Sequence, residues 1–311
     1  MSFPSIQWYP GHIAKAEKAL QDQLKRVDVV LEVRDARIPL STLHPNLEKW
    51  IAGSKRVLVI NRVDMITTEV RDRWQAWFKA QGQVAYFTDG NQGKGVGQIS
   101  RAAQAAGVAM NKRRQARGML PRPVRAVVVG FPNVGKSALI NRLLKQRVVE
   151  SARKAGVTRQ LRWVRISEEL ELLDSPGIIP SQLDNQEAAL KLAICDDIGQ
   201  AAYDTQRVAS AFVDLINTLD KSEQARALGN SEAPLNELPL NVNQLHQRAQ
   251  ALQARYGINP TDYTGETYLC MLADQLFQGS QERAARKLLI EFRKGVLGKL
   301  SLESPPDLPS E

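Results

Sequence analysis

The stretch VVVGFPNVGKSALI, residues 127–140, decides how the rest of this 311-residue chain is interpreted. It contains the pattern G-x-x-x-x-G-K-[ST] between Gly130 and Ser137, preceded by a β-branched apolar run and followed by residues with helical spacing. Glycines in such a loop allow backbone N–H groups to turn toward phosphate oxygens at the start of a helix. The stretch therefore predicts a strand, a phosphate-binding loop and a helix.

The residues of this loop are expected to divide the contacts to a nucleoside triphosphate. Lys136 is expected to reach the β- and γ-phosphate oxygens, and the hydroxyl of Ser137 to coordinate Mg²⁺. The predicted contact residues are Asn133, Val134, Gly135, Lys136, Ser137 and Ala138. Because the loop recognises phosphates and no base, the residues that select the base must lie elsewhere in the chain.

The sequence around the loop alternates short apolar runs with amphipathic segments. Strands are expected at 28–33, 56–60, 84–87, 125–129, 161–166 and 170–173, and helices at 12–27, 67–81, 96–114 and 136–145. This alternation predicts an α/β fold with a mostly parallel sheet and helices on both faces.

After Pro180 only helical spacing is found, as at 185–198 and 281–294, with a loop expected at 227–241. An all-α C-terminal domain is therefore predicted. The expected organisation is an N-terminal arm and first helix at 1–26, a nucleotide-binding domain at 27–182 and a helical domain at 183–311.

The tetrapeptide Asn61-Arg62-Val63-Asp64 follows the strand expected at 56–60 and is the candidate base selector. A carboxylate at Asp64 can accept hydrogen bonds from guanine N1–H and N2–H₂ together, whereas adenine offers neither donor. Asn61 is expected to bond the other edge of the base and to tie neighbouring loops together, and the planar guanidinium of Arg62 to lie on the base face. The predicted ligand is GTP, contacted by all four residues including Val63.

Three further segments complete the predicted site. Asp89 and Gly90 follow the strand expected at 84–87, and they either contact guanine O6 or belong to an unrelated turn. Asp174 ends the strand expected at 170–173 and is expected to hold the Mg²⁺ shell through water, while the Gly177 amide senses the γ-phosphate. Thr158 is either a further Mg²⁺ ligand or an ordinary loop threonine.

These motifs occur in the order base selector, O6 turn, phosphate loop, switch threonine and Asp-x-x-Gly turn, which is a circular permutation of the usual GTPase order. Over essentially its whole length the chain resembles the RbgA/YlqF family of circularly permuted ribosome-assembly GTPases. The narrower match rests on WYPGH at 8–12, VRDARIP at 33–39, FRKG at 292–295 and Leu297-Gly298. His44 stands where the family turn has Asn.

The resemblance implies a GTPase that binds a late precursor of the large ribosomal subunit in its GTP form and is released on hydrolysis. Ile178 occupies the place of the Gln that orients the attacking water in many GTPases, so slow intrinsic hydrolysis is expected. The resemblance places a catalytic role on His12, although a histidine packed at the start of the first helix is an equal alternative. A ribosomal component is a second possible source of the group that orients the attacking water. Asn133 resembles the Asn that holds K⁺ in potassium-dependent GTPases.

The charge balance favours a polyanionic partner. Lys and Arg number 42 against 33 Asp and Glu, for a net charge of +9. Basic runs lie at 101–125 and 142–165, and Arg283, Arg286, Lys287, Arg293 and Lys294 occupy the last expected helix. Aromatic residues make up only 6% of the chain, so recognition of rRNA through phosphates and shape is expected, and no DNA partner is predicted.

The remaining composition points to a cytoplasmic protein with no membrane partner. The two cysteines, Cys195 and Cys270, indicate neither a disulfide framework nor a zinc site, and no apolar run is long enough to span a bilayer. Two other functions fit the same motifs: an rRNA-binding scaffold that nucleotide merely stabilises, and a signalling GTPase with a protein effector.

Overall fold

The computed structural model describes residue 6, residue 18 and residues 20–51, 54–144, 162–174, 185–199, 202–227 and 247–306. The predictions on His12, Thr158 and Gly177, and all but the first residue of the loop expected at 227–241, lie outside these residues. For Asp174 only the backbone is described.

The described strands form one sheet in the order β3-β2-β1-β4-β6-β5. They are Val29–Asp35 (β1), Lys55–Asn61 (β2), Ala85–Thr88 (β3), Val124–Val129 (β4), Arg162–Ser167 (β5) and Leu170–Asp174 (β6). Neighbouring strands pair in parallel except β5, which is antiparallel to β6. The mostly parallel sheet predicted from the sequence is confirmed.

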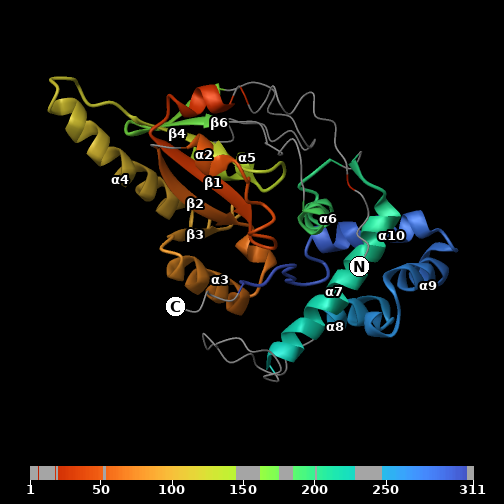
Figure 1. The fold of residues 1–311 in the computed structure, drawn as a ribbon. Helices are drawn as coiled ribbons and strands as arrows, with labels where there is room; N and C mark the ends of the chain where they lie inside the picture. The colour runs from red at the N-terminus through yellow and green to blue at the C-terminus, as the bar shows by residue number, and fades with distance from the viewer. Residues whose placement is uncertain are drawn as a thin grey trace.

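Successive residues of β1 point to opposite faces of this sheet, and both faces are covered by helices. Val29, Leu31 and Val33 pack in the same core as the helices Val96–Gln115 (α4) and Lys136–Leu143 (α5). Val30 faces the other side, where it packs with Leu20 and Leu24 of the first helix and with the short helix Leu47–Trp50 (α2). The predicted covering of both faces is therefore confirmed (Figure 1).

Helix α3, Thr68–Ala80, covers the β2 part of the second face. Trp74 and Phe78 are fully buried against Leu58 and Ile60. The helix begins at Thr67, whose side chain accepts a hydrogen bond from the Val70 amide, and a one-turn 3-10 helix, Val63–Met65 (η1), precedes it. The base-selector tetrapeptide thus lies in a tight turn between β2 and α3.

The C-terminal part is all-helical within the described residues. Its helices are Gln186–Cys195 (α6), Thr205–Ala227 (α7), Gln247–Tyr256 (α8), Gly265–Phe277 (α9) and Gln281–Arg293 (α10), with a 3-10 turn at Pro260–Asp262 (η4). They gather beside the sheet, with α6 nearest to it in Figure 1. The rings of Phe212 and Phe292, 4.9 Å apart, join α7 to α10 in this core.

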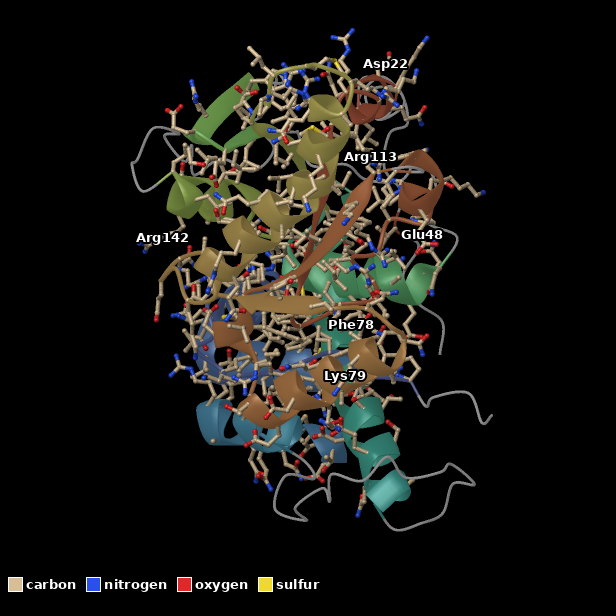
Figure 2. All side chains as sticks on the ribbon, turned by 90° about the vertical axis from the view of Figure 1, so that its left-hand side faces the viewer. Asp22, Glu48, Phe78, Lys79, Arg113 and Arg142 are labelled. Carbon is tan, nitrogen blue, oxygen red and sulfur yellow. The ribbon has the colours of Figure 1, made fainter. Side chains whose placement is uncertain are left out.

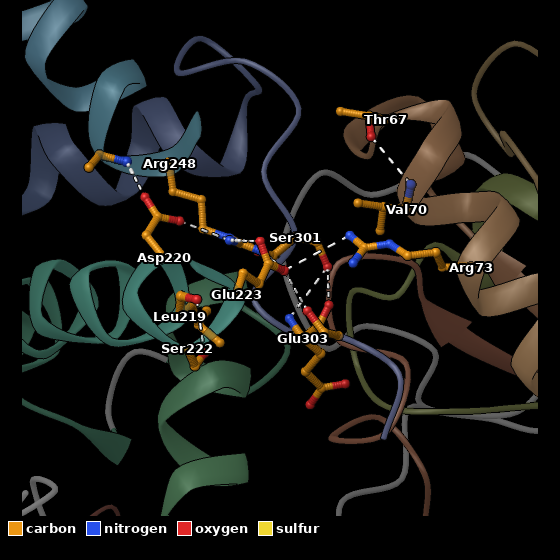
Figure 3. A network of polar contacts seen from close by, with 12 residues as sticks. Thr67, Val70, Arg73, Leu219, Asp220, Ser222, Glu223, Arg248, Ser301 and Glu303 are labelled. Carbon is orange, nitrogen blue, oxygen red and sulfur yellow. Dashed lines mark hydrogen bonds and ion pairs between the residues drawn. The ribbon is translucent and has the colours of Figure 1, made fainter. Parts of the chain in front are cut away.

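A buried polar network joins α7, α8 and the segment after α10 (Figure 3). Arg248 donates to Asp220 at 2.9 Å, to Glu223 at 3.0 Å and to the Ser301 carbonyl at 2.7 Å. Burial opposes ionisation of Glu223, but Arg248 prevails and lowers the pKa of that carboxyl. Arg73 of α3 approaches the same Glu223 to 3.9 Å, so the network also reaches the α/β part.

Candidate functional site

The candidate site lies at the carboxyl edge of the sheet, where parallel strands release their loops on one side. Asp35 at the end of β1 is paired with Asn61 at the end of β2, and Asn61 with Thr88 at the end of β3. The phosphate loop, Gly130–Ser137, leaves β4 at the same edge. Segments far apart in the sequence therefore meet here.

Asn61 is the residue that joins these loops. Its amide Nδ2 donates to the Val134 carbonyl at 2.8 Å, while its Oδ1 accepts from the Gly90 amide at 2.9 Å and the Thr88 hydroxyl at 3.1 Å. The side chain is 2% exposed, so these hydrogen bonds are shielded from water. One amide thus fixes the base-selector turn, the β3 turn and the phosphate loop relative to one another.

The phosphate loop has the backbone that its glycines predict. Gly135 has a φ of +95°, and a Cβ there would lie 2.2 Å from Asn61 Nδ2, so both conformation and space require glycine. Lys136 begins α5 and is buried, and its Nζ donates to the carbonyls of Gly130 at 3.1 Å and Phe131 at 2.7 Å. The ammonium group is therefore held across the loop.

Asp64 and Asp89 lie close enough to influence each other but have different surroundings. Asp89 Oδ1 accepts from the amides of Asn91 and Gln92 and so closes its own turn. Asp64 is half-buried, and its Oδ1 has no hydrogen-bond partner among the described residues. Burial, followed by the charge of Asp89, raises the pKa of Asp64. A buried acceptor of this kind requires donors from a ligand or water.

Arg62 connects the base-selector turn to the phosphate loop. Its guanidinium donates to the Asn133 carbonyl, and its Nε lies 3.5 Å from Asp35. Arg62 has a φ of +63°, in the left-handed region, and this turn directs its side chain back toward the phosphate loop. The buried carboxylate of Asp35 thus attracts a second cation besides Arg37.

The C-terminal end of α6 is held by three side chains from distant segments, a junction that sequence reasoning missed. Asn133 of the phosphate loop donates to the Asp196 carbonyl at 2.6 Å. Arg37 donates to the Cys195 carbonyl at 3.3 Å, and Arg293 of α10 to those of Ala193 at 2.8 Å and Ile194 at 2.9 Å. Carbonyls at a helix end have no partner within the helix, so these donors supply it.

Arg37 is itself buried and paired. It forms a bidentate ion pair with Asp35, at 3.0 Å and 2.7 Å, and both side chains are 0% exposed. Burial disfavours the Asp35 carboxylate, but Arg37 and Arg62 outweigh it and the pKa of Asp35 is lowered. Burial and the charge of Asp35 raise the pKa of neighbouring Asp197.

The sequence signals for this junction were Asn133 in the phosphate loop and the segments VRDARIP and FRKG, which contain Arg37 and Arg293. The two segments marked a family resemblance, and nothing in the sequence indicated that they meet Asn133 at α6. Among the described residues no group of three or more His, Cys, Asp or Glu side chains is arranged to hold a metal ion.

The predicted basic surface on the last helix is only partly found. Arg293 contacts α6 carbonyls, as described above, and is therefore engaged inside the molecule. Arg286 and Lys287 pair with Glu282 and Glu291 one turn away, at 2.6 Å and 3.1 Å.

The described part of the chain contains no helix long and apolar enough to cross a membrane.

A parallel sheet with a glycine-rich phosphate loop, and a base-selector turn bonded to that loop from an earlier strand, define a circularly permuted P-loop GTPase. A family model described as "50S ribosome-binding GTPase" matches residues 125–236. The Ribosome biogenesis GTPase A of Bacillus cereus is 32% identical over 302 residues, covering 97% of this chain and 95% of that protein. That of Priestia megaterium is 32% identical over 304 residues, covering 97% and 98%.

The solved structure described as GDP-bound YlqF is 20% identical, covers 93% of this chain and all of that chain, and has a TM-score of 0.59. It supports the fold assignment. The chain belongs to the Ribosome biogenesis GTPase A (RbgA/YlqF) family, and it is a GTP hydrolase with a role in ribosome assembly.

Proposed function

We propose that this GTPase binds a late precursor of the large ribosomal subunit in its GTP form and leaves it after hydrolysis. The observation that carries the GTP part is Asp64, a half-buried acceptor in a turn that Asn61 bonds to the phosphate loop. Guanine supplies two donors for such a carboxylate. The subunit part is supported by the names of the relatives and by the 50S description of the family model. The proposed compartment is the cytoplasm.

The proposal assigns each nucleotide contact to a particular group. Asp64 selects guanine, Lys136 stabilises the β- and γ-phosphates, and the Ser137 hydroxyl coordinates Mg²⁺. Thr158 and, through water, Asp174 complete the proposed Mg²⁺ shell. The remaining proposed contacts are Asn61, Arg62, Val63, Asp89, Gly90, Asn133, Val134, Gly135, Ala138 and Gly177.

The proposed reaction is slow in the free protein. Ile178 cannot orient an attacking water, so His12 or a ribosomal group supplies that function. An activating partner of this kind accelerates other GTPases by about 10³–10⁵-fold. Bound Mg²⁺ would neutralise charge on the phosphates, while Lys136 acts on the same oxygens from the protein side.

Asn133 is the proposed K⁺ ligand. Its Nδ2 is already committed to the Asp196 carbonyl, so its Oδ1 is the atom left to coordinate a cation beside the phosphates. The steady-state hydrolysis rate is expected to rise in KCl relative to NaCl at equal ionic strength. Equal rates in the two salts would remove K⁺ from the proposal.

The function is tested by sedimenting the purified chain with isolated ribosomal subunits in GDP and in a non-hydrolysable GTP analogue. Migration with large-subunit particles in the analogue only is the expected result. Equal migration in both states would indicate a scaffold that nucleotide merely stabilises. No migration in either state would favour a signalling GTPase with a protein effector.

A further inference from the structure

The strongest feature outside the nucleotide site is a basic groove at the far end of α4. It is an open groove of about 270 Å³, lined by Met110, Arg113, Arg114, Arg117, Met119 and Arg122. Figure 1 shows α4 projecting from the side of the sheet opposite to the helical domain. Figure 2 labels Arg113 near that end of the helix, where nitrogen-tipped side chains project from the ribbon.

The groove is built by the segment 116–123, which folds back on α4. The side chain of Asn111 holds this segment through two hydrogen bonds. Its Nδ2 donates to the Arg122 carbonyl at 3.0 Å, and its Oδ1 accepts from the Arg122 backbone amide at 3.1 Å. Arg114 Nε donates to the Leu120 carbonyl at 3.1 Å, which leaves its terminal nitrogens available to other acceptors. The walls are thus fixed by hydrogen bonds within the chain.

The charge of this groove is largely uncompensated. Arg122 is neutralised by Asp28, with contacts at 2.8 Å and 2.9 Å. Arg113 and Arg117 are exposed, and neither has an acidic partner within the described ranges. Arginines held in one groove with free planar guanidinium groups fit the oxygen pairs of phosphates.

The groove lies at the amino edge of the sheet, away from the nucleotide. Helix α4 starts after β3 at the carboxyl edge and crosses the sheet, and the chain then enters β4 at Val124. A Cβ at Gly107 would lie 1.8 Å from Val124 Cγ2, so the helix is packed closely on the start of that strand. A ligand in the groove and GTP at the carboxyl edge therefore do not compete for space.

We propose that this groove is a binding site for the phosphate backbone of RNA. The proposal rests on the proposed function, because a precursor of the large subunit presents such a backbone on its surface. Met119 and Leu120, 39% and 83% exposed, flank the arginines and provide apolar contact to ribose or bases. Cations in the last turn of α4 also complement the helix dipole, but Arg117 and Arg122 lie beyond that turn.

The test is fluorescence anisotropy of the full-length chain with a labelled RNA hairpin at several salt concentrations. The groove variant is Arg113→Gln with Arg117→Gln. The matched control is Lys79→Gln with Lys299→Gln, which removes the same charge from exposed sites elsewhere. We expect the groove variant to bind roughly tenfold more weakly, with a salt slope lower by about one for each arginine that contacts phosphate.

The control pair should bind as the parent does, and Arg113→Lys with Arg117→Lys should restore most of the affinity. Equal weakening in groove and control variants would overturn the proposal, because overall charge would then explain binding. Unchanged RNA affinity of the groove variant would overturn the proposal as well. So would displacement of the labelled hairpin by polyglutamate, at equal charge, but not by unlabelled hairpin. If the chain bound the RNA hairpin through the groove but did not sediment with ribosomal subunits, the proposed function alone would be overturned.

Discussion

At the carboxyl edge of the sheet, Arg37, Arg62 and Lys136 are held by carboxylates and carbonyl groups. At the amino edge, Arg113 and Arg117 are exposed, without an acidic partner in the part of the chain that the structure describes. The same sheet thus presents one edge whose cations are already positioned and one whose cations are free to meet a ligand. Buried, bonded groups suit selective recognition, whereas exposed cations suit recognition of a repeating polyanion.

The largest effect that should separate the two edges is expected from Lys136→Ala. Loss of the ammonium group removes a positioned donor to the phosphates, so kcat/KM for GTP should fall by about 10²–10³-fold. RNA-hairpin affinity should stay within twofold of the parent, a margin of about 0.4 kcal/mol. Single-turnover hydrolysis and anisotropy measure the two quantities, and Lys79→Ala is the matched exposed control. A parallel loss of RNA binding would show that the edges are not independent.

Asp64→Asn is expected to change which base is bound. The amide still accepts one hydrogen bond but places an N–H against a guanine donor, so GTP affinity should fall by about 1.5–3 kcal/mol. Xanthine carries a carbonyl in place of the guanine 2-amino group, and XTP should therefore bind the variant better than GTP does. Competition against a fluorescent nucleotide measures both affinities. An unchanged preference for GTP over ATP and XTP would remove Asp64 from the base-selector role.

Arg293→Met tests the connection between the carboxyl edge and the helical domain. The substitution keeps an apolar stem but removes the side-chain donors to the Ala193 and Ile194 carbonyls, so the free energy of unfolding should fall by about 1–3 kcal/mol. Because α6 also contacts Asn133, nucleotide affinity should change with it.

Arg286→Met on the same helix is the control for that experiment. Arg286 is exposed and, among the residues that the structure describes, forms only an i,i+4 pair with Glu282, so its loss should cost under about 0.5 kcal/mol. Urea unfolding and nucleotide titration are compared for the two variants. If Arg293→Met altered stability but left nucleotide affinity equal to that of the control, α6 would be only a structural link.

Much of the fold could be predicted because its signals are local. Alternating apolar runs gave the strands within one or two residues, as at β1 and β2, and the glycine pattern located the phosphate loop. Helices α7 to α9 were expected only as a class. Their boundaries depend on packing among helices, as in the contact of Phe212 with Phe292, and no local pattern contains that information.

Residues of the site could be predicted where the chemistry of the side chain alone indicates its role. They could not be predicted where the role depends on which segments meet in the folded chain. Asp64 follows from the donors of guanine, and Lys136 from the loop pattern. The position of Arg62 depended on the buried charge of Asp35, which a sequence does not reveal. The roles of Arg37 and Arg293 at α6 depended on a meeting of segments 158 and about 100 residues apart. Charge runs were equally ambiguous. On α10, Arg286 and Lys287 are paired with glutamates, whereas Arg113 and Arg117 at the end of α4 have no acidic partner among the described residues.

The smallest expected effect is a pH dependence that belongs to one edge only. His44 is buried, with its ring 4.5 Å from that of Trp50 and 6.4 Å from that of Phe131 in the phosphate loop. Burial lowers the pKa of His44 to about 4, from an ordinary value of 6.5. Between these values the unfolded chain binds more protons than the folded one, so the free energy of unfolding falls as pH falls from 6.5 toward 4.

His44→Asn should therefore unfold with a shallower pH dependence than the parent between pH 7 and pH 5, measured by urea denaturation across the range. Arginines do not titrate in this window, so groove-dependent RNA affinity should be flat over the same pH values. Because variant and parent contain the same carboxylates, the difference between their pH dependences of unfolding free energy reports on His44 alone. Identical slopes would mean that the imidazole is protonated without cost in the folded state, and the pH sensitivity of the carboxyl edge would then have to come from another group.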